Sequence, residues 1–285
     1  MTYRLAALDI DGTVLRSDRR VSARTRAAIA AARAAGVQVV LVTGRRYPAA
    51  RRVADEVGPE LPLVLHNGAL IVAANEVLAY TPLPRGVAVE AIRIGRAHGA
   101  DPVVHAGRRG EGRLLVERVS PDNPLLTFYL ERSQPDVVRV SDLVAALDLE
   151  DDTLEVMFGG SCTTLEALVP LLELGLGDRA RVERTLYPQR GVAIVDVIGP
   201  AVGKAAALAV LARHFGIARA QTLAVGDNWN DREMLEWAGL GLVMGNAVPG
   251  LQALGMPVLP TNDEDGVARA IEHYILGPAA EDHKR

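Results

Sequence analysis

The stretch Leu5-Ala6-Ala7-Leu8-Asp9-Ile10-Asp11-Gly12-Thr13 decides the fold, because an apolar run ends there in two acids and a glycine. A run that is apolar on both faces is typical of a strand buried in a parallel sheet. Ligands of open α/β sheets bind outside the carboxyl ends of such strands. Asp9 and Asp11 therefore stand where a binding site is expected.

The two acids lie two residues apart, and residues at that spacing share one face of an extended chain. We therefore expect Asp9 and Asp11 to point toward one spot. Two carboxylates about 4 Å apart repel each other by roughly 4 kcal/mol at an effective dielectric of about 20, so the pair requires a cation or a shared proton. A divalent metal ion is the natural partner. The alternative is a solvated turn with an Asx cap, since Asp-Gly is common in turns.

The amino-terminal part of the chain alternates between strand and helix patterns. Strand patterns at 4–10, 37–43 and 61–65 are separated by helix patterns at 22–35 and 48–57. Helices of this length between strands indicate right-handed βαβ units, which build a parallel sheet.

A break follows at Pro82 and Pro84, because neither a helix nor a central strand tolerates two prolines so close together. From residue 87 onward the order of helices and strands changes and is typical of a separate α+β module. A glycine-rich joint at 199–203 ends this module, and the first pattern resumes at 204–244.

The fold class that these patterns predict is α/β, with one domain interrupted by an insert. The Rossmann-like parallel-sheet core takes residues 1–83 and 200–277, and the α+β insert takes 84–199. We expect the two joints to lie together in space. Residues 278–285 are expected to form a loose tail.

Composition excludes several classes of protein. The 285 residues carry 31 basic and 35 acidic side chains, interspersed along the chain, and the net charge of -4 leaves no footprint for nucleic acid. No apolar run approaches the ~20 residues that a membrane span needs, and the amino terminus lacks the pattern of a signal peptide. The single cysteine, Cys162, rules out a disulfide framework and a cysteine metal site. We therefore expect a cytoplasmic protein.

Four short signals fall at predicted strand ends or helix starts. They are Asp9-Ile10-Asp11-Gly12-Thr13, Thr43-Gly44-Arg45, Lys204 before an alanine-rich helix, and Gly226-Asp227-Asn228-Trp229-Asn230-Asp231. An anion at the third signal would meet both an ammonium group and the positive end of a helix dipole. Because all four belong to the edge where α/β enzymes place their sites, they are more informative together than apart.

This set of motifs, in this order, resembles the haloacid dehalogenase superfamily of phosphotransferases. The long insert between the second and third motifs resembles the large α/β cap of the Cof-type subgroup. Further similar stretches are Asn67-Gly68-Ala69, Met244-Gly245-Asn246-Ala247 and Asn262-Asp263-Glu264-Asp265-Gly266-Val267. One departure is Ala205, which stands where the subgroup usually has glycine. We expect it to adjust the helix start without removing the charge of Lys204.

The resemblance implies a role for each acid. Asp9 would be the nucleophile that attacks phosphorus and forms an aspartyl-phosphate. Asp11 would act as general acid for the leaving alcohol and then as base for water. Mg2+ would be held by Asp9, by the backbone carbonyl of Asp11 and by Asp227, and Asp231 would orient a bound water or Lys204.

The resemblance also assigns the phosphate contacts, with Arg45 in a supporting role. The phosphate oxygens would be met by Thr43, Gly44, Lys204 and Asn230. The charge balance agrees with this assignment, because Asp9 repels a phosphate dianion unless a metal ion, an ammonium group and N–H donors reverse the sign. The expected function is Mg2+-dependent hydrolysis of small phosphate monoesters, such as sugar phosphates or related metabolites.

Substrate choice is expected to lie in the cap. Its candidate contacts are His105, Arg108, Arg109 and Arg113, and the alternative is a solvated basic loop. Trp229 could either shield the site or pack under the cap. The sequence does not reveal the metabolite or the oligomeric state.

Three other functions compete with this one. Gly199-Pro200-Ala201-Val202-Gly203-Lys204-Ala205 resembles a P-loop, but it has three residues between the glycines instead of four, and Ala205 cannot ligate Mg2+. A phosphomutase would use the same aspartate and return the phosphoryl group to a sugar. A non-catalytic sugar-phosphate-binding module is disfavoured because all four acids are present.

Overall fold

The apolar run that ends at Asp9 forms β1 (Leu5–Asp9), which is buried along its whole length in the computed structural model of the chain. The structure describes residues 3–107, 112–147 and 153–277. It divides into two compact units, the first made of Met1–Arg45, Ala49–Glu76 and Gly203–Arg285, and the second of Arg46–Pro48 and Val77–Val202. The boundary at 202/203 falls within the glycine-rich joint at 199–203, whereas the boundary at 76/77 comes earlier in the chain than the expected one after residue 83.

The first unit is built on a sheet with the strand order β13-β12-β1-β2-β3-β4-β5. Its first five strands in this order are parallel, with Ala7 paired to both Ala224 and Val40, and β4 then pairs antiparallel to β3. The strands are β2 (Gln38–Val42), β3 (Leu63–Leu65), β4 (Leu70–Ala73), β5 (Glu76–Tyr80), β12 (Thr222–Gly226) and β13 (Leu240–Val243). The strand order places β1 in the middle, so its carboxyl end has a neighbouring strand end on each side.

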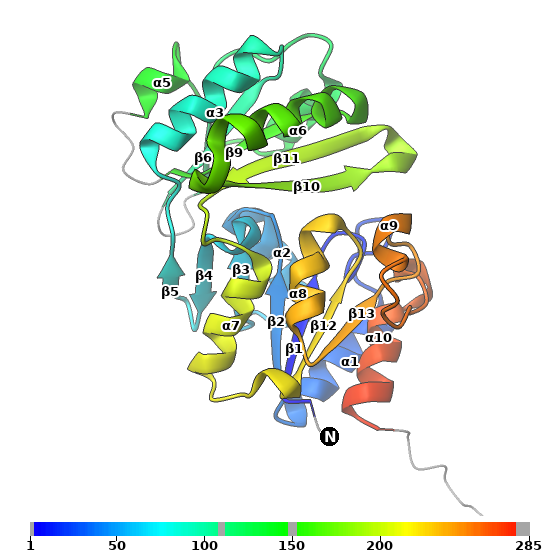
Figure 1. Cartoon of the computed structure of the whole chain (residues 1–285). Helices are drawn as coiled ribbons and strands as arrows, with labels where there is room; N and C mark the ends of the chain where they lie inside the picture. The colour runs from blue at the N-terminus through cyan, green and yellow to red at the C-terminus, as the bar shows by residue number, and fades with distance from the viewer. Residues whose placement is uncertain (1–2, 108–111, 148–152, 278–285) are drawn as a thin grey trace, which may run out of the picture. The chain divides into compact units, whose positions relative to one another are not determined.

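Helices cover both faces of this sheet, as Figure 1 shows. On one face α1 (Ala23–Ala34) packs against α10 (Gly266–Ala270), and on the other α7 (Lys204–His214) packs against α8 (Arg232–Trp237). Ser22 caps α1 by accepting a hydrogen bond from the backbone N–H of Thr25. Helix α2 (Tyr47–Val57) and the short α9 (Pro249–Gln252) complete the unit. The expected Rossmann-like parallel core is confirmed.

The second unit has a sheet with the order β10-β11-β9-β6-β7-β8. All of its neighbouring strands are antiparallel except β7 and β8. The strands are β6 (Pro102–Ala106), β7 (Arg113–Val116), β8 (Val137–Arg139), β9 (Thr153–Ser161), β10 (Arg181–Tyr187) and β11 (Val192–Ile198). The helices are α3 (Arg85–Ala97), α4 (Pro124–Arg132), α5 (Leu143–Ala146) and α6 (Cys162–Leu176).

The main core of the second unit lies between its sheet and the pair α3 and α6. It contains Ile92, Phe158 and Leu172, none of which exposes any surface. A smaller cluster around Met157 and Leu130 joins the sheet to α4. This layered arrangement is the α+β insert expected from the sequence.

The two joints of the second unit are neighbours. A Cβ added to Gly199 would lie 3.6 Å from the carbonyl oxygen of Pro82 and 3.8 Å from a methyl of Thr81. The chain therefore enters and leaves this unit at one place, as expected for an insert.

Several elements lie outside the sequence-based predictions. Strands β4, β5 and β8 and helices α4 and α10 were not expected. Helix α4 begins at Pro124 behind the cap Asn123, so a proline that suggests a loop is in fact a first-turn residue. Cys162 is the first residue of α6 and packs against the core of the second unit. Among the residues described, no helix is both long and apolar enough to span a membrane.

Candidate active site

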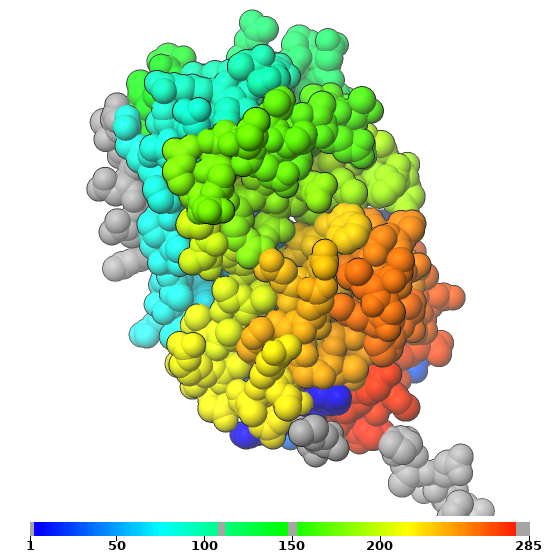
Figure 2. All heavy atoms as spheres, in the orientation of Figure 1, coloured from blue at the N-terminus to red at the C-terminus, as the bar shows by residue number. Residues whose placement is uncertain are grey.

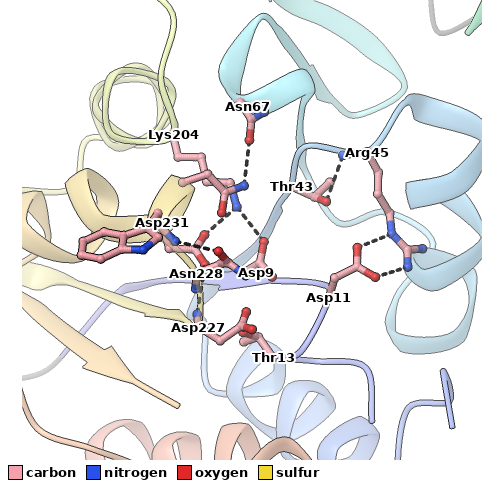
Figure 3. Close-up of polar contacts among 12 residues, drawn as sticks. Asp9, Asp11, Thr13, Thr43, Arg45, Asn67, Lys204, Asp227, Asn228 and Asp231 are labelled. Atoms are coloured by element: carbon pink, nitrogen blue, oxygen red, sulfur yellow. Dashed lines mark hydrogen bonds and ion pairs between the residues drawn. The ribbon is translucent and has the colours of Figure 1, made fainter. Parts of the chain in front are cut away.

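Asp9 and Asp227 end two neighbouring parallel strands and meet at their carboxyl edge. Asp9 is the last residue of β1 and is 5% exposed, and Asp227 follows β12 and is 8% exposed. Together with Asp231, which is fully buried, they place carboxylate oxygens within 4.8 Å of one another. Acids from opposite ends of the sequence thus form one buried cluster, as Figure 3 shows.

Lys204 supplies positive charge to this cluster. It is the first residue of α7 and only 2% exposed, and its Nζ lies 2.7 Å from Oδ1 of Asp9 and 2.5 Å from Oδ1 of Asp231. A close backbone approach helps to place it, because a Cβ on Gly68 would lie 2.5 Å from the carbonyl oxygen of Gly203. The loop after β3 and the start of α7 therefore fit together only with glycine at residue 68.

Asp231 is held on both of its oxygens. Oδ1 pairs with Lys204, and Oδ2 accepts the backbone N–H groups of Asp227 at 3.0 Å and of Asn228 at 3.1 Å. An acid engaged in this way fixes the loop around it, which fits the supporting role expected for Asp231 better than direct metal binding.

The cluster shifts the pKa values of its members. Burial, with the charge of Asp231 adding to it and Lys204 opposing it, raises the pKa of Asp9 to about 8. Burial and the charges of Asp9 and Asp231 also raise the pKa of Asp227 well above its usual range. Burial alone would lower the pKa of Lys204, but its two carboxylate partners outweigh burial and raise it. The acids are thus short of positive charge.

Gly12 lets the two acid-bearing loops approach each other. Its φ is +78°, and an added Cβ would lie 2.3 Å from Oδ2 of Asp227. The next residue, Thr13, donates its hydroxyl to Oδ1 of Asp227 at 3.2 Å. Any side chain at position 12 would therefore push Asp227 out of place.

Asp11 does not point where the sequence suggested. Its carboxylate turns away from Asp9 and binds Arg45, with Nε to Oδ2 and Nη2 to Oδ1 both at 2.6 Å. The expectation that Asp9 and Asp11 face one spot is wrong, because β1 ends at Asp9 and the alternation of a strand does not extend into the turn. Arg45 therefore contacts the expected general acid directly.

The expected phosphate contacts gather beside the acids. Thr43 is 2% exposed, and its hydroxyl accepts the N–H of Arg45 at 3.1 Å. Asn230 donates to Oδ1 of Asn67 at 3.0 Å, and a Cβ on Gly44 would lie 3.1 Å from the same Asn67 oxygen. Thr43, Gly44 and Asn230 are thus grouped around Asn67.

The structure describes two of the four substrate contacts expected in the insert. His105 lies in β6, is 2% exposed, and pairs through Nδ1 with Oε1 of Glu155 at 2.7 Å. Arg113 begins β7 and is partly buried. Arg108 and Arg109 lie outside the described residues.

Trp229 packs against its own unit. A Cβ added to Gly250 would lie 2.4 Å from the Trp229 ring. The half-buried ring therefore rests on the backbone at α9, within its own unit.

A divalent metal ion fits the side chains of this cluster. Asp9 and Asp227 offer carboxylate oxygens, the ligands that Mg2+ prefers in proteins. Burial and the neighbouring acids raise the pKa values of both, and Lys204 is the cation that opposes the rise, which is the response of a site that can take up a further cation. Sequence reasoning missed Thr13 and Asn67 as members of the site, although both stand inside the motif stretches.

The profile of the haloacid dehalogenase-like hydrolase family matches residues 6–117 and 179–271. The chain is 30% identical to the HMP-PP phosphatase of Serratia proteamaculans (strain 568), over 97% of this chain and 97% of that protein. It is 27% identical to the 5-amino-6-(5-phospho-D-ribitylamino)uracil phosphatase YitU of Bacillus subtilis (strain 168), over 95% of this chain and 97% of that protein.

The fold is shared with solved structures. A haloacid dehalogenase-like hydrolase from Bacteroides thetaiotaomicron superimposes with a TM-score of 0.78 at 25% identity, over 95% of this chain and 99% of that one. The family match extends over both parts of the split core, where the acid cluster lies. The chain therefore belongs to the haloacid dehalogenase-like hydrolase family, as a Cof-type phosphatase.

Proposed function

We propose that the protein hydrolyses small phosphate monoesters with the help of Mg2+, using Asp9 as the nucleophile. The observation that carries this proposal is the buried cluster of Asp9, Asp227 and Asp231 around the ammonium group of Lys204. Three acids with one cation suit a site that takes up a second cation.

The chemistry proposed for Asp9 is attack of a carboxylate oxygen on phosphorus. The bond from phosphorus to the ester oxygen breaks, and Asp9 becomes an aspartyl-phosphate. Water then attacks phosphorus, the bond to Asp9 breaks, and inorganic phosphate leaves. Lys204 already contacts Asp9 and would offset the negative charge that an incoming phosphate brings.

Asp11 is proposed to give a proton to the leaving alcohol and to take one from the attacking water. In the structure it is held by Arg45 through both oxygens, so this ion pair must open before Asp11 can act. An arriving phosphate could exchange with Asp11 on Arg45, because guanidinium binds phosphate and carboxylate with the same fork of donors.

Mg2+ would be held by Asp9, by Asp227 and by the backbone carbonyl of Asp11. When bound, it would supply positive charge that draws electrons from the phosphoryl oxygens. Thr13 and Gly12 keep Asp227 in position for this role. Asn230, Thr43 and Gly44 are the proposed partners of the remaining phosphate oxygens.

The proposed substrates are small phosphorylated metabolites, including sugar phosphates. Two relatives are named as an HMP-PP phosphatase and a 5-amino-6-(5-phospho-D-ribitylamino)uracil phosphatase, which supports a small phosphorylated substrate here. A phosphomutase remains the second candidate, because it would use the same aspartate. The two differ in product, since only a hydrolase releases inorganic phosphate steadily.

The test is a screen of phosphorylated metabolites and p-nitrophenyl phosphate, measuring inorganic phosphate with Mg2+ and with EDTA. We expect steady release with Mg2+ and almost none with EDTA. Conversion of a sugar phosphate to its isomer without phosphate release would identify a mutase instead. Equal release in EDTA would contradict the proposed metal dependence.

A further inference from the structure

The turn that follows β13, residues 244–248, touches both loops that carry the acids. Its backbone bonds to the end of β12 and to the loop after it, with Met244 N–H donating to the carbonyl of Gly226 and Val248 N–H to that of Asp227, both at 3.0 Å. From the same turn, the side chain of Asn246 reaches the first acid loop and donates to the carbonyl of Gly12 at 2.8 Å. One short segment therefore fastens both acid-bearing loops.

A second asparagine extends this connection. Asn246 accepts the backbone N–H of Asn262 on its Oδ1 at 2.9 Å, and Asn262 donates its own amide to the carbonyl of Leu15 at 2.8 Å. The loop after β1 is thus held at Gly12 and again at Leu15. Both asparagines are half-buried, so solvent competes only in part for these bonds.

The orientation of the Asn246 amide is fixed by its partners. Its nitrogen faces a carbonyl, which can only accept, and its oxygen faces an N–H, which can only donate. No other arrangement of this amide satisfies both neighbours, and a side chain without both functions would leave one neighbour unsatisfied.

The loop requires such support, because Gly12 is a flexible residue at its centre. Glycine must stand there to admit Asp227, and the same freedom allows the loop to sample other conformations. The carbonyl of Asp11, the backbone ligand proposed for Mg2+, belongs to the peptide that enters Gly12. Holding the carbonyl of Gly12 restrains the ψ torsion of that glycine and, through the fixed Cα, limits how far the preceding peptide can move.

We propose that Asn246 is a positioning residue for the metal site, and that with Asn262 it sets the loop of Asp9 to Gly12 against Asp227 for binding of a divalent cation. This inference rests on the proposed function, since it concerns the same site. Groups that orient metal ligands typically account for about 10-fold to 100-fold in metal affinity. We therefore expect Asn246→Ala to weaken cation binding within that range.

The experiment titrates the purified full-length chain with Mn2+ as a probe for Mg2+ and follows free Mn2+ by electron paramagnetic resonance, well below the melting temperature. Asn246→Ala should raise the dissociation constant about 10-fold or more. Asn262→Ala should raise it less, because Asn262 acts on the Gly12 carbonyl through Asn246, one hydrogen bond further away. In steady-state assays the Mg2+ concentration for half-maximal rate should rise, while the rate at saturating Mg2+ recovers in large part.

Asn123→Ala is the matched control. Asn123 also bridges two segments, donating to Asp101 and to the carbonyl of Gly159, but it lies in the second unit. Its loss should lower the melting temperature and leave Mn2+ affinity unchanged. The inference fails if Asn246→Ala behaves in the same way, and Asn262→Ala decides the case if Asn246→Ala does not fold. A wild-type chain that binds no Mn2+ would overturn the proposed function and this inference with it.

Discussion

The two sheets of the molecule bury charged groups in different ways. In the first unit the acids stand where parallel strands end, and three carboxylates share one ammonium group. In the second unit His105 and Glu155 face each other from neighbouring strands, with Nδ1 of His105 2.7 Å from Oε1 of Glu155. The first arrangement holds more acids than cations, whereas the second sets one acid against one imidazole.

This difference separates a site that does chemistry from a pair that supports a fold. An excess of buried acids costs stability and is explained by a ligand that restores the balance. The comparison predicts that acids in the two sheets respond in opposite ways to substitution, in activity and in stability.

The largest effect is expected from Asp9→Asn. The amide cannot form the aspartyl-phosphate, so release of phosphate from p-nitrophenyl phosphate should fall by at least about 10³-fold. The melting temperature should stay within about 4 °C, a change of 1–2 kcal/mol, because the substitution relieves crowding among the acids while Lys204 keeps Asp231.

Glu155→Ala is the counterpart in the second sheet. It leaves His105 buried without its carboxylate, which should cost about 1–3 kcal/mol of unfolding free energy. Turnover of p-nitrophenyl phosphate should stay within about 10-fold of the wild type, since catalysis is assigned to the other sheet. A loss of activity as large as that of Asp9→Asn would remove the distinction between the sheets.

Lys204→Met should lower both the stability and the activity. It removes the cation from a group of buried acids, which typically costs about 3–5 kcal/mol, and a lost contact to the phosphate costs about 10²-fold to 10³-fold in rate. Denaturation in EDTA and assays in Mg2+ measure the two effects. Arg232→Met is the control, because its pair with Glu236 is exposed and its loss should change neither the stability nor the rate measurably.

The stability of the metal-free protein should fall as the pH rises. The pKa of Asp9 is about 8 in the folded chain and about 3.9 when unfolded, so between these values the folded state holds more protons than the unfolded state. The melting temperature in EDTA should therefore decrease from about pH 5 to about pH 8. Asp263 and Glu272, whose pKa values hydrogen bonds lower, contribute the opposite slope only at more acid pH.

Magnesium should reduce this dependence, because a bound cation takes the place of the proton on Asp9. The rise in melting temperature on adding Mg2+ should thus be larger at about pH 8 than at about pH 5. Calorimetry in two buffers of different ionisation enthalpy should detect protons released as Mg2+ binds. An equal stabilisation at both pH values would contradict the raised pKa of Asp9.

The sequence allowed the acid cluster to be predicted because each of its members follows a strand or begins a helix. Asp9, Lys204 and Asp227 are local signals, and the topology of a parallel sheet brings their positions together. The direction of Asp11 could not be found in this way, since it depends on a turn and on its partner Arg45. The contact of Asn246 with Gly12 joins residues 234 positions apart and leaves no periodic pattern.

The second sheet was harder to predict for a related reason. His105 and Glu155 lie inside their strands among apolar neighbours, so no change from apolar to polar residues at a strand end marks them. His105 was singled out as a substrate contact, and its pairing with Glu155 follows from a strand register that the sequence does not show. The insert was expected because the pattern of helices and strands changes at its boundaries. Helix α4 was not expected, because it begins at Pro124 and proline usually suggests a loop.

The smallest effect is expected from Arg45→Lys, and it tests whether burial alone sets the strength of an ion pair in this site. The side chains of Arg45 and Asp11 are 25% and 40% exposed, whereas those of Lys204 and Asp9 are 1% and 7% exposed. Lysine keeps the charge and loses the two-pronged contact, which at a partly solvated pair should cost less than about 1 kcal/mol, or under about 4 °C in melting temperature. Because Asp11 must leave Arg45 before it can give a proton, a weaker pair should not reduce the availability of Asp11. A fall in stability comparable to that of Lys204→Met would show that the Asp11 pair belongs to the buried cluster after all.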